Sequence, residues 1–423
     1  MPLKNHPLRA RVVSEMHMRR MPPLGAGVQM IQVVRLVEPT DREAEFAHVT
    51  AMPGVDAGAL SLDDRHVSGH APGGAEFLWE RHSEASTMTA ILPHRQANPF
   101  AGEVGDEDAL AWLAGAPGQV VRAVRVGVVG DEEEAARIAG TLEFSEPDLV
   151  SCTIGAARIW SDYRIHDDGF GRLLVAAGDV TPADLGRLVQ RLQELGNYRN
   201  LALLGLPVVQ AEAPALAALE AELVDISRRL ATGAADKALL DELCALSARV
   251  AAVIDATAFR MSATAAYAQI VQDRLDGLEC GCIPGFQKLD DFIDRRLFPA
   301  TRTCASFVAR LESLAVRIER ATSLLRTRVE MAVQAQNVEL LRSMERTGAR
   351  QLRLQHLVEG LSVVAVSYYA LSLIAYVIRA LAPAMGVEID LVEALALPVV
   401  LAVVWIYLRR RVKRIHGEDD EHA

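Results

Sequence analysis

LVEGLSVVAVSYYALSLIAYVI (357–378) is followed, after a short connection, by LVEALALPVVLAVVWIYL (391–408). A helix needs roughly 20 mostly apolar residues to cross a bilayer, and both segments approach that length. The connection, 379–390, is short enough to hold the two segments as a hairpin. The sequence therefore predicts a membrane anchor near the C-terminus, with the chain before about residue 350 on one side of the bilayer.

Basic residues lie outside both apolar segments. They are Arg342, Arg346, Arg350 and Arg353 before the first, and Arg409, Arg410, Arg411, Lys413 and Arg414 after the second. Cytoplasmic flanks collect Lys and Arg. We therefore expect a multi-pass protein of the cytoplasmic (inner) membrane, with both termini cytoplasmic, 379–390 as an external loop and 409–423 as a basic cytoplasmic tail. Two buried core helices are the alternative.

The composition limits the classes of partner. The chain has 423 residues and a formal net charge of −11, and its basic residues cluster at the two ends. No basic patch extends across a predicted fold, so we expect membrane lipid as a partner and no nucleic acid. Five cysteines on the predicted cytoplasmic side are expected to be reduced thiols.

Residues 1–206 are predicted to form a cytoplasmic mixed α/β domain. Expected strands lie within Gly27–Val37, Ala75–Leu92 and Gly118–Val129, and a hairpin turn lies at His166–Gly169. Helices are expected after two start signals. These signals are Thr40 with Glu43, a capping-box pattern, and Thr181 with Pro182.

Residues 207–300 are predicted to be a helical hairpin region, broken near Thr232–Gly233, followed by a turn at Gly281–Gly285 and a short helix ending near Pro299. Residues 301–356 are predicted to be a long stalk helix that continues into the first span. A helix of this length, roughly 100 Å, needs partner helices or other subunits. Its apolar positions are Phe307, Leu311, Leu314, Ile318, Leu325, Val329, Leu340 and Met344. The expected fold class is α+β, with a long antiparallel helical stalk and a two-helix transmembrane hairpin.

Catalytic signatures are missing from the sequence. It contains no Walker A loop, no HExxH and no GxSxG, so we expect no enzyme. Cys280-Gly-Cys282 with Cys304 is a poor match to zinc spacing, which usually places two to four residues between paired cysteines. We therefore expect no resident metal site.

Two charged clusters are candidates for a ligand or partner site. The first comprises Arg9, Glu15, His17 and Arg19, which a helix over Arg9–Met18 would display as ion pairs or as an anion or partner site. The second comprises Glu80, Arg81 and His82. Strand alternation would place Glu80, His82 and Glu84 on one face and Trp79 and Arg81 on the other, and neither face resembles a normal core face. A sheet edge and a site lining both fit that segment.

A polar face runs along the first apolar segment. It comprises Glu359, Ser362, Tyr369, Ser372 and Tyr376, and Asn337 precedes it on the stalk. Ionisable groups near membranes are costly and often functional, which makes these residues pore-lining candidates. Packing between helices is the alternative, because Ser and Tyr are common where helices meet.

The stretches HPLRARVVSEMHMRRMPPL, WERHSE, GNYRNLALLGLP and QLRLQHLVEGLSVVAVSYY resemble a family of uncharacterised bacterial membrane-anchored proteins, known only as a domain of unknown function. The resemblance spans essentially the whole chain. It implies membrane anchoring and brings no established activity.

A second resemblance is architectural, to the CorA-type magnesium transporters. It implies a homopentamer whose long helices line a pore, acidic residues in the external loop (here Glu388 and Asp390), and a divalent cation as the transported ion. The chain departs from that family at the outer end of the first span. YVIRAL (376–381) stands where those transporters carry Gly-Met-Asn, and an Arg at the mouth would repel cations.

Two functions follow as hypotheses. The first is a membrane-anchored homo-oligomer of CorA-like architecture that passes ions. The second is a non-conducting, membrane-tethered scaffold or sensor whose cytoplasmic α/β domain binds a ligand or a partner.

Overall fold

The computed structural model describes residues 3–15, 21–94, 96, 98–102, 106–232, 236–385, 394, 398–407 and 410. The chain divides into two compact units, Met1–Thr322 and Ser323–Ala423. The first unit holds the sheet and its helices. The second unit holds the later part of the last long helix and the C-terminal apolar segment.

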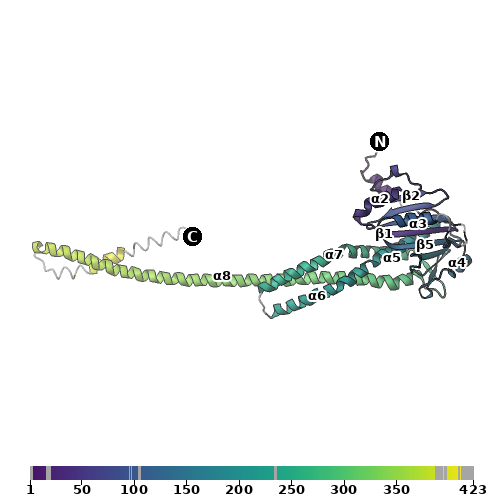
Figure 1. Cartoon of the computed structure of the whole chain (residues 1–423). Coiled ribbons are helices and arrows are strands. Elements are labelled where there is room, and N and C mark those ends of the chain that lie inside the picture. The colour runs from purple at the N-terminus through teal and green to yellow at the C-terminus, as the bar shows by residue number, and fades with distance from the viewer. Residues whose placement is uncertain are drawn as a thin grey trace. The chain divides into compact units, whose positions relative to one another are not determined.

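One mixed sheet forms the centre of the first unit (Figure 1). Its nine strands run in the order β2-β3-β4-β1-β5-β8-β7-β6-β9. Only the β5–β8 pair is parallel, and the other neighbours are antiparallel. The bounds are β1 Val28–Leu36, β2 His66–His70, β3 Glu76–Arg81, β4 Ala85–Pro93, β5 Gln119–Val129, β6 Val150–Ile154, β7 Ala157–Ser161, β8 Gly171–Ala176 and β9 Cys280–Cys282.

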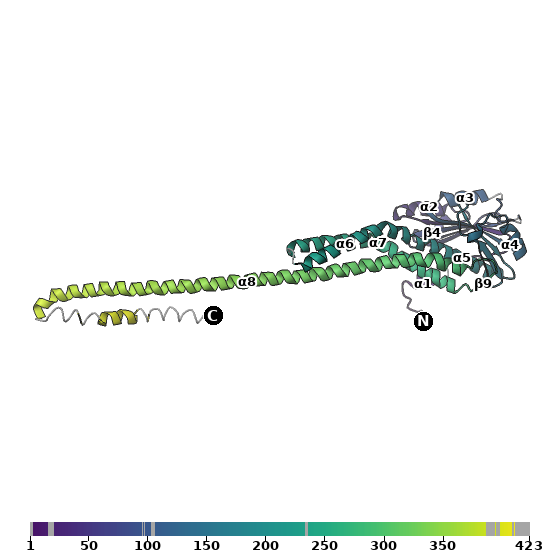
Figure 2. The ribbon, with the colours of Figure 1, turned by 90° about the horizontal axis from the view of Figure 1, so that it is seen from below.

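Helices cover both faces of this sheet (Figure 2). α2 and α3 lie on one face and α5 lies on the other, so β1 and β4 are buried on both sides and read as nearly continuous buried runs. The bounds are α1 Arg9–Glu15, α2 Arg42–Thr50, α3 Asp106–Gly115, α4 Glu132–Ala139, α5 Pro182–Leu203, α6 Gly205–Ala231, α7 Asp236–Asp276 and α8 Leu289–Met385, with single 3₁₀ turns at Pro39–Asp41, Ala57–Ala59 and Glu146–Asp148.

The two faces of the sheet belong to different hydrophobic clusters. On the α5 face, Met30, Val124 and Val126 pack with the apolar side chains of α5 and with Leu289 and Ile293 at the start of α8. On the opposite face, Ile31, Val33 and Trp79 pack with Leu113 of α3 and Val49 of α2. The side chains of the central strands therefore alternate between two hydrophobic cores.

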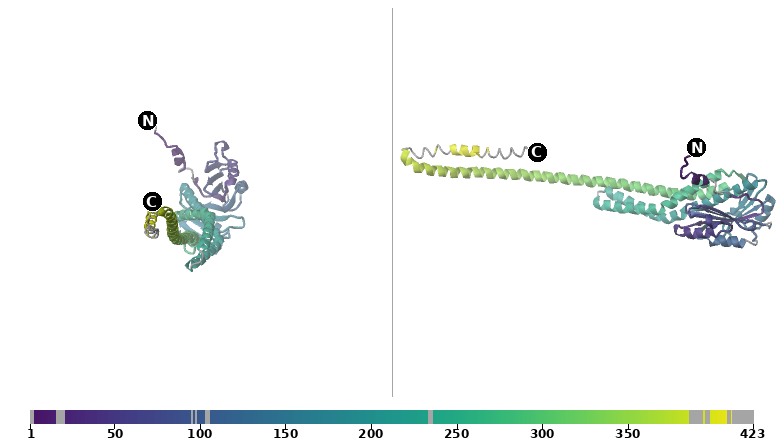
Figure 3. Two further views of the ribbon diagram at one scale, coloured as in Figure 1. Left: turned by 90° about the vertical axis from the view of Figure 1, so that its left-hand side faces the viewer. Right: turned by 90° about the horizontal axis from the view of Figure 1, so that it is seen from above.

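α6 and α7 form a helical pair beside the first part of α8 (Figure 3). Phe307, Leu311, Leu314 and Ile318 of α8 are buried, at spacings of three and four residues that keep them on one helix face. Arg310 of α8 pairs with Glu220 of α6 at 2.6 Å. α6 ends at Ala231 and α7 begins at Asp236, so two helices lie on either side of the expected break near Thr232–Gly233.

The strand predictions for Gly27–Val37, Ala75–Leu92 and Gly118–Val129 are confirmed, and Thr181 caps α5 by accepting a hydrogen bond from the Asp184 amide. The expected turn at Gly281–Gly285 is present at Ile283–Phe286, where the Phe286 amide donates to the Ile283 carbonyl, and its first two predicted residues belong to β9, which pairs with β6. Two predictions are wrong. The cap of α2 is Asp41 and not Thr40, and it makes no side-chain capping bond. The helix expected to end near Pro299 continues, because α8 begins at Leu289 and runs through that position.

In the second unit, α8 continues through 357–378 to Met385. The predicted external loop at 379–390 is thus helical in its first part, and 386–390 lies outside the described residues. The described part of the second apolar segment is a short apolar helix, Pro398–Tyr407. Among the residues that the structure describes, two helices are long and apolar enough to cross a membrane, Pro182–Ala231 and Leu289–Val377. The first of these includes α5, whose apolar side chains lie in the core.

The turn between β3 and β4 is tied to α7 by a paired charge, which gives a stability prediction. Arg260 Nη1 donates to Glu84 Oε1 at 2.9 Å, and the two side chains are only 18% and 10% exposed. Arg260→Ala should lower the free energy of unfolding by about 2–4 kcal/mol, because the buried Glu84 carboxylate loses its cationic partner.

The measurement is chemical unfolding of the detergent-solubilised protein, followed by tryptophan fluorescence. Arg249→Ala is the matched control, because its pair with Glu222 is 53% and 39% exposed and should contribute less than about 1 kcal/mol. Equal losses in the two variants would contradict the role given to the Arg260–Glu84 pair.

Candidate functional site

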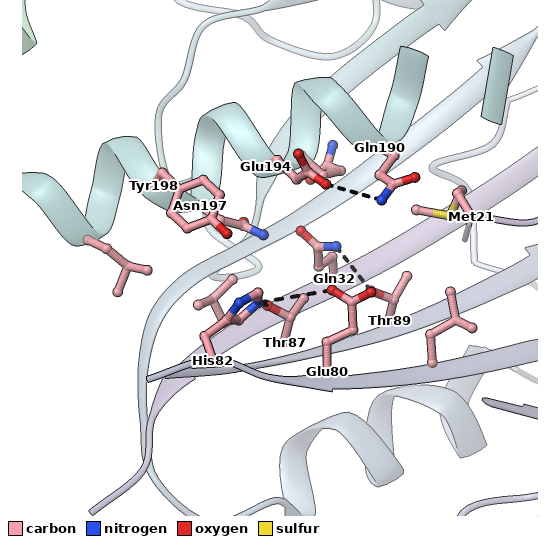
Figure 4. A pocket seen from close by; sticks show the side chains of 14 residues that line it. Met21, Gln32, Glu80, His82, Thr87, Thr89, Gln190, Glu194, Asn197 and Tyr198 are labelled. Atoms are coloured by element: carbon pink, nitrogen blue, oxygen red, sulfur yellow. Dashed lines mark hydrogen bonds and ion pairs between the residues drawn. The ribbon is translucent and has the colours of Figure 1, made fainter. Parts of the chain in front are cut away.

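A polar pocket lies between the sheet and α5 (Figure 4). Its volume is about 40 Å³. Polar side chains reach it from β1, β3, β4, the β3–β4 turn and α5. Its lining comprises Met21, Gln32, Val34, Leu78, Glu80, His82, Thr87, Thr89, Gln190, Gln193, Glu194, Asn197, Tyr198 and Leu201.

Strand alternation supplies the sheet side of the pocket. On β1, Gln32 takes the position between Met30 and Val34 on the α5 face, and it is buried. On β4, Thr87 and Thr89 are buried on the same face. Gln32 Nε2 donates to Thr89 Oγ1 at 3.0 Å, so neighbouring strands are joined by polar side chains as well as by backbone.

The helix side comes from one stripe of α5. Gln190, Gln193, Glu194, Asn197 and Tyr198 recur at spacings of three and four residues, which places them on one face of the helix. Gln190 Nε2 donates to Glu194 Oε1 at 3.1 Å. Gln193 and Asn197 are buried among apolar neighbours. Buried amides require partners, and these amides face a cation.

That cation is Arg122 of β5. Its Nη1 donates to Gln32 Oε1 at 3.2 Å, to Gln193 Oε1 at 2.8 Å and to Asn197 Oδ1 at 2.8 Å. Burial, and then the charge of Arg199, lower the pKa of Arg122 to about 9, so the guanidinium remains charged at neutral pH.

Gly196 makes room for this arrangement. A Cβ at position 196 would lie 2.7–2.8 Å from the guanidinium of Arg122. The absence of a side chain on α5 at this point therefore lets the guanidinium lie directly against the helix.

A carboxylate and a histidine, Glu80 and His82, line the pocket, and His66 lies beside Glu80. Glu80 lies 4.0 Å from His82 Nε2 and 3.9 Å from His66 Nε2, which is ion-pair distance and too long for a hydrogen bond. His82 also lies 3.4 Å from Thr87 Oγ1, and its ring meets Tyr198 edge-on. Among the described residues no group of three His, Cys, Asp or Glu side chains is placed to hold a metal ion. The pocket is equipped to hydrogen-bond a polar group.

The structure brings only part of the second predicted cluster to the pocket. Glu80 and His82 line it, while Arg81 lies on the opposite face, over the Trp79 ring and donating to the Leu62 carbonyl at 2.8 Å. The alternation was therefore predicted correctly. The statement that neither face is a core face is wrong, because Trp79 is 1% exposed and donates to Glu45 at 3.0 Å. β3 is not a sheet edge either, since β2 lies outside it.

Of the first predicted cluster, Arg9 is the member whose side chain is described, and it is not among the residues that line this pocket. Arg9 is exposed on α1 and donates to Asn5. Glu15 is the last residue of α1, and its side chain lies outside what the structure describes, as do His17 and Arg19.

The pore-lining candidates are described only within the second unit. Glu359 pairs with His356 at 3.4 Å, and the hydroxyls of Ser362 and Ser372 donate to the carbonyls four residues earlier. Asn337, Tyr369 and Tyr376 are exposed. Glu388 and Asp390 lie outside the described residues.

Sequence reasoning missed the amides and the cation that define the pocket. Two signals were present. Gln32 interrupts an otherwise apolar face of β1, and α5 carries polar residues at helical spacing beside its leucines. Three of the stretches that carry the family resemblance also meet here, through Met21, Glu80 with His82, and Asn197 with Tyr198.

The family model described as "Protein of unknown function (DUF3422)" matches residues 4–415, and the chain belongs to this family. No curated protein and no solved structure matches the chain. The predicted membership of an uncharacterised family is thereby confirmed. Membrane anchoring and CorA-type architecture stay predictions.

The hydrogen bonds to Arg122 can be tested on stability. Gln193→Met should cost about 1.5–3 kcal/mol of unfolding free energy, because a hydrogen bond to a buried charged group is lost while the side-chain length is kept. The control is Gln272→Met, whose amide bonds Asp276 on the exposed side of α7 and should change stability by less than about 0.5 kcal/mol. Chemical unfolding of both variants measures the difference, and a silent Gln193→Met would mean that the amide does not hold Arg122.

Proposed function

We propose that this protein is a membrane-tethered sensor whose α/β domain binds a small ligand beside α5. The observation that carries the proposal is the convergence of buried polar groups from β1, β4, β5 and α5 inside an otherwise apolar fold. Burying a polar group costs stability unless it forms hydrogen bonds. A cluster of this many polar groups between the sheet and α5 therefore favours a role in binding a ligand.

The tether rests on the apolar surface of α8 in the second unit. Leu357, Leu361, Leu373 and Tyr376 are 70%, 71%, 69% and 82% exposed. Soluble proteins rarely leave contiguous apolar surface of this extent uncovered. A bilayer would cover it, and the helix is long enough to cross one.

Self-association is part of the same proposal. Before the apolar segment, Val338, Leu340, Leu341 and Met344 of α8 are 47%, 60%, 64% and 62% exposed within one chain. They are mixed with charged residues, which disfavours burial in lipid. A second copy of the chain is the partner we propose for this part of α8, giving a homo-oligomer.

The tether is tested by flotation of membranes from cells that express the full chain. We expect the protein to float with the membranes and to resist carbonate extraction. The double variant Leu361→Lys with Leu373→Lys should move it to the soluble or aggregated fraction, because each central charge costs about 2.5–3.5 kcal/mol on insertion. Leu354→Lys, at an exposed position before the apolar segment, is the control and should still float. An unchanged double variant would argue against the tether.

Ion passage is the second candidate, and a specific observation favours it. α8 is helical from 357 to 378, so Ser362, Tyr369 and Tyr376 share one face of the helix at seven-residue spacing. A ring of copies would turn that polar face inward. The serine hydroxyls already bond their own helix, which weakens their value as ion ligands.

The two candidates are separated by mass and by flux. A pentamer, measured by light scattering with the detergent mass subtracted, is required for a CorA-like pore, and a monomer or dimer excludes it. For a pore, Glu359→Ala and Ser372→Leu should change divalent-cation flux into proteoliposomes by about tenfold or more, the size expected when a pore-lining charge or polar group is lost. Unchanged flux in both variants would exclude the pore and favour the tethered sensor.

A further inference from the structure

A second cavity lies beside the polar pocket, at the point where the parallel pair of strands begins. β5 starts at Gln119, but β8 joins it only at the Val124–Gly171 pair. The residues of β5 before Val124 therefore lack a strand neighbour on that side, and the cavity occupies the space. Its volume is about 130 Å³. Arg122, Tyr163, Arg172, Arg199 and Asn200 are among its lining residues.

Two of these lining residues, Arg122 and Arg199, are arginines that form no ion pair with a carboxylate in the described parts of the chain. Arg122 donates to neutral amides, and Arg199 donates to Asn200 Oδ1 at 3.0 Å. The nearby acids are engaged elsewhere: Asp148 pairs with Arg164 at 2.6 Å, Asp162 with His166 at 3.2 Å and Asp168 with Arg125 at 3.4 Å. Arg172 is paired with Arg125 in the β5–β8 register, so its side chain points to the other face of the sheet, where it donates to the Leu142 carbonyl at 2.9 Å. Arg122 and Arg199 thus bring uncompensated positive charge to the cavity in a protein of net charge −11.

The guanidinium of Arg199 has unused hydrogen-bonding capacity. Its Nη1 is buried and has no acceptor among the described residues. The guanidinium lies over the Tyr163 ring, 4.6 Å from its centre, which fixes its plane. Burial lowers the pKa of Arg199, and it raises the pKa of Tyr163, so the phenol is a neutral hydrogen-bond donor.

The backbone at the cavity is also unusual. Tyr163 has a φ of 53°, in the left-handed region that a bulky residue rarely adopts. Its ring stacks on Phe292 of α8, with centroids 4.9 Å apart, and this contact holds the conformation in place. Strained residues held by their surroundings are frequent at ligand sites.

We propose that this cavity binds a small dianionic solute, a phosphoryl or dicarboxylate compound, between the guanidinium groups of Arg122 and Arg199. Arginine presents a planar fork of donors that matches such oxyanions, and an anion would satisfy the orphan Nη1. A cavity of about 150 Å³ holds benzene, a molecule of six non-hydrogen atoms. The cavity of about 130 Å³ therefore has room for a group the size of phosphate or of a small dicarboxylate's charged end.

This inference goes beyond the proposed ligand pocket, because it assigns a dianion to a neighbouring cavity that the Arg122 network connects to that pocket. The experiment uses the full chain, purified in detergent and exchanged into phosphate-free buffer. Thermal unfolding is followed by tryptophan fluorescence while inorganic phosphate, glycerol 3-phosphate or succinate is added, with potassium chloride and glycerol as the ionic-strength and neutral controls. We expect at least one dianion to raise Tm by about 3 °C or more at 10 mM, and the controls to leave it unchanged.

The variants assign that binding to the cavity. Arg199→Gln should lower the affinity for the dianion by about tenfold or more, because a charge-assisted pair of hydrogen bonds is lost. The Tm without ligand should stay the same or rise, since an unpaired buried cation is removed. Arg187→Gln on the same helix is the control, because that arginine is exposed and pairs with Asp184. Arg199→Lys, which keeps the charge without the fork, should bind with intermediate affinity and serves if the glutamine variant fails to fold.

Three results would overturn the proposal. They are a chloride response equal to that of the dianions, no response to any dianion, and an undiminished response in both Arg199 variants. Each of these is distinct from failure of the tether, which the flotation experiment measures. If the domain bound only a neutral or cationic ligand, the proposed sensor function would stand and the proposed anion site would be refuted.

Discussion

Burial of the Arg122 guanidinium between the sheet and α5 constrains the residues around it. A buried charge costs several kcal/mol unless hydrogen bonds replace its hydration. Here the replacement comes from amide oxygens on two elements, Gln32 on β1 and Gln193 and Asn197 on α5. Position 196 must also be a glycine, because a side chain there would occupy the space of the guanidinium. The polar stripe of α5 is therefore the environment that one cation requires.

Amide oxygens are neutral acceptors, so their effect on the charge of Arg122 differs from that of a carboxylate. A carboxylate beside Arg122 would have cancelled its charge and closed the site electrostatically, as Glu84 does for Arg260. Amides solvate the cation and leave its charge uncompensated. The Arg122 network joins the polar pocket on one side to the second cavity on the other, since its amide partners line the first and Arg122 itself lines the second. An anion that entered the second cavity would act on the hydrogen bonds that also shape the polar pocket.

The sequence predicted most of the strands, because alternation and turn residues are local properties. It also predicted which of Glu80, Arg81 and His82 share a face, since side-chain direction in a strand depends only on parity. It could not show that Trp79 is buried, because that depends on Glu45 of a distant helix accepting its indole hydrogen bond. Nor could it single out Arg122 over Arg125 in the run VVRAVRV. The two arginines point to opposite faces, and only the fold shows that one of them meets amides and the other meets Asp168.

The sequence predicted one long helix beginning at 301. The helix is present, but it begins earlier, at Leu289, because Pro299 does not interrupt α8. Along this helix the apolar register changes. Cys304, Leu311, Ile318 and Leu325 recur every seven residues and are buried, whereas the same register continues as Ala332, Glu339 and Arg346. The large apolar residues beyond, such as Leu340 and Met344, lie in another register and are exposed. A register shift of this kind moves the apolar stripe to another face of the helix. The stripe on that face is the surface that the proposed second copy of the chain would cover.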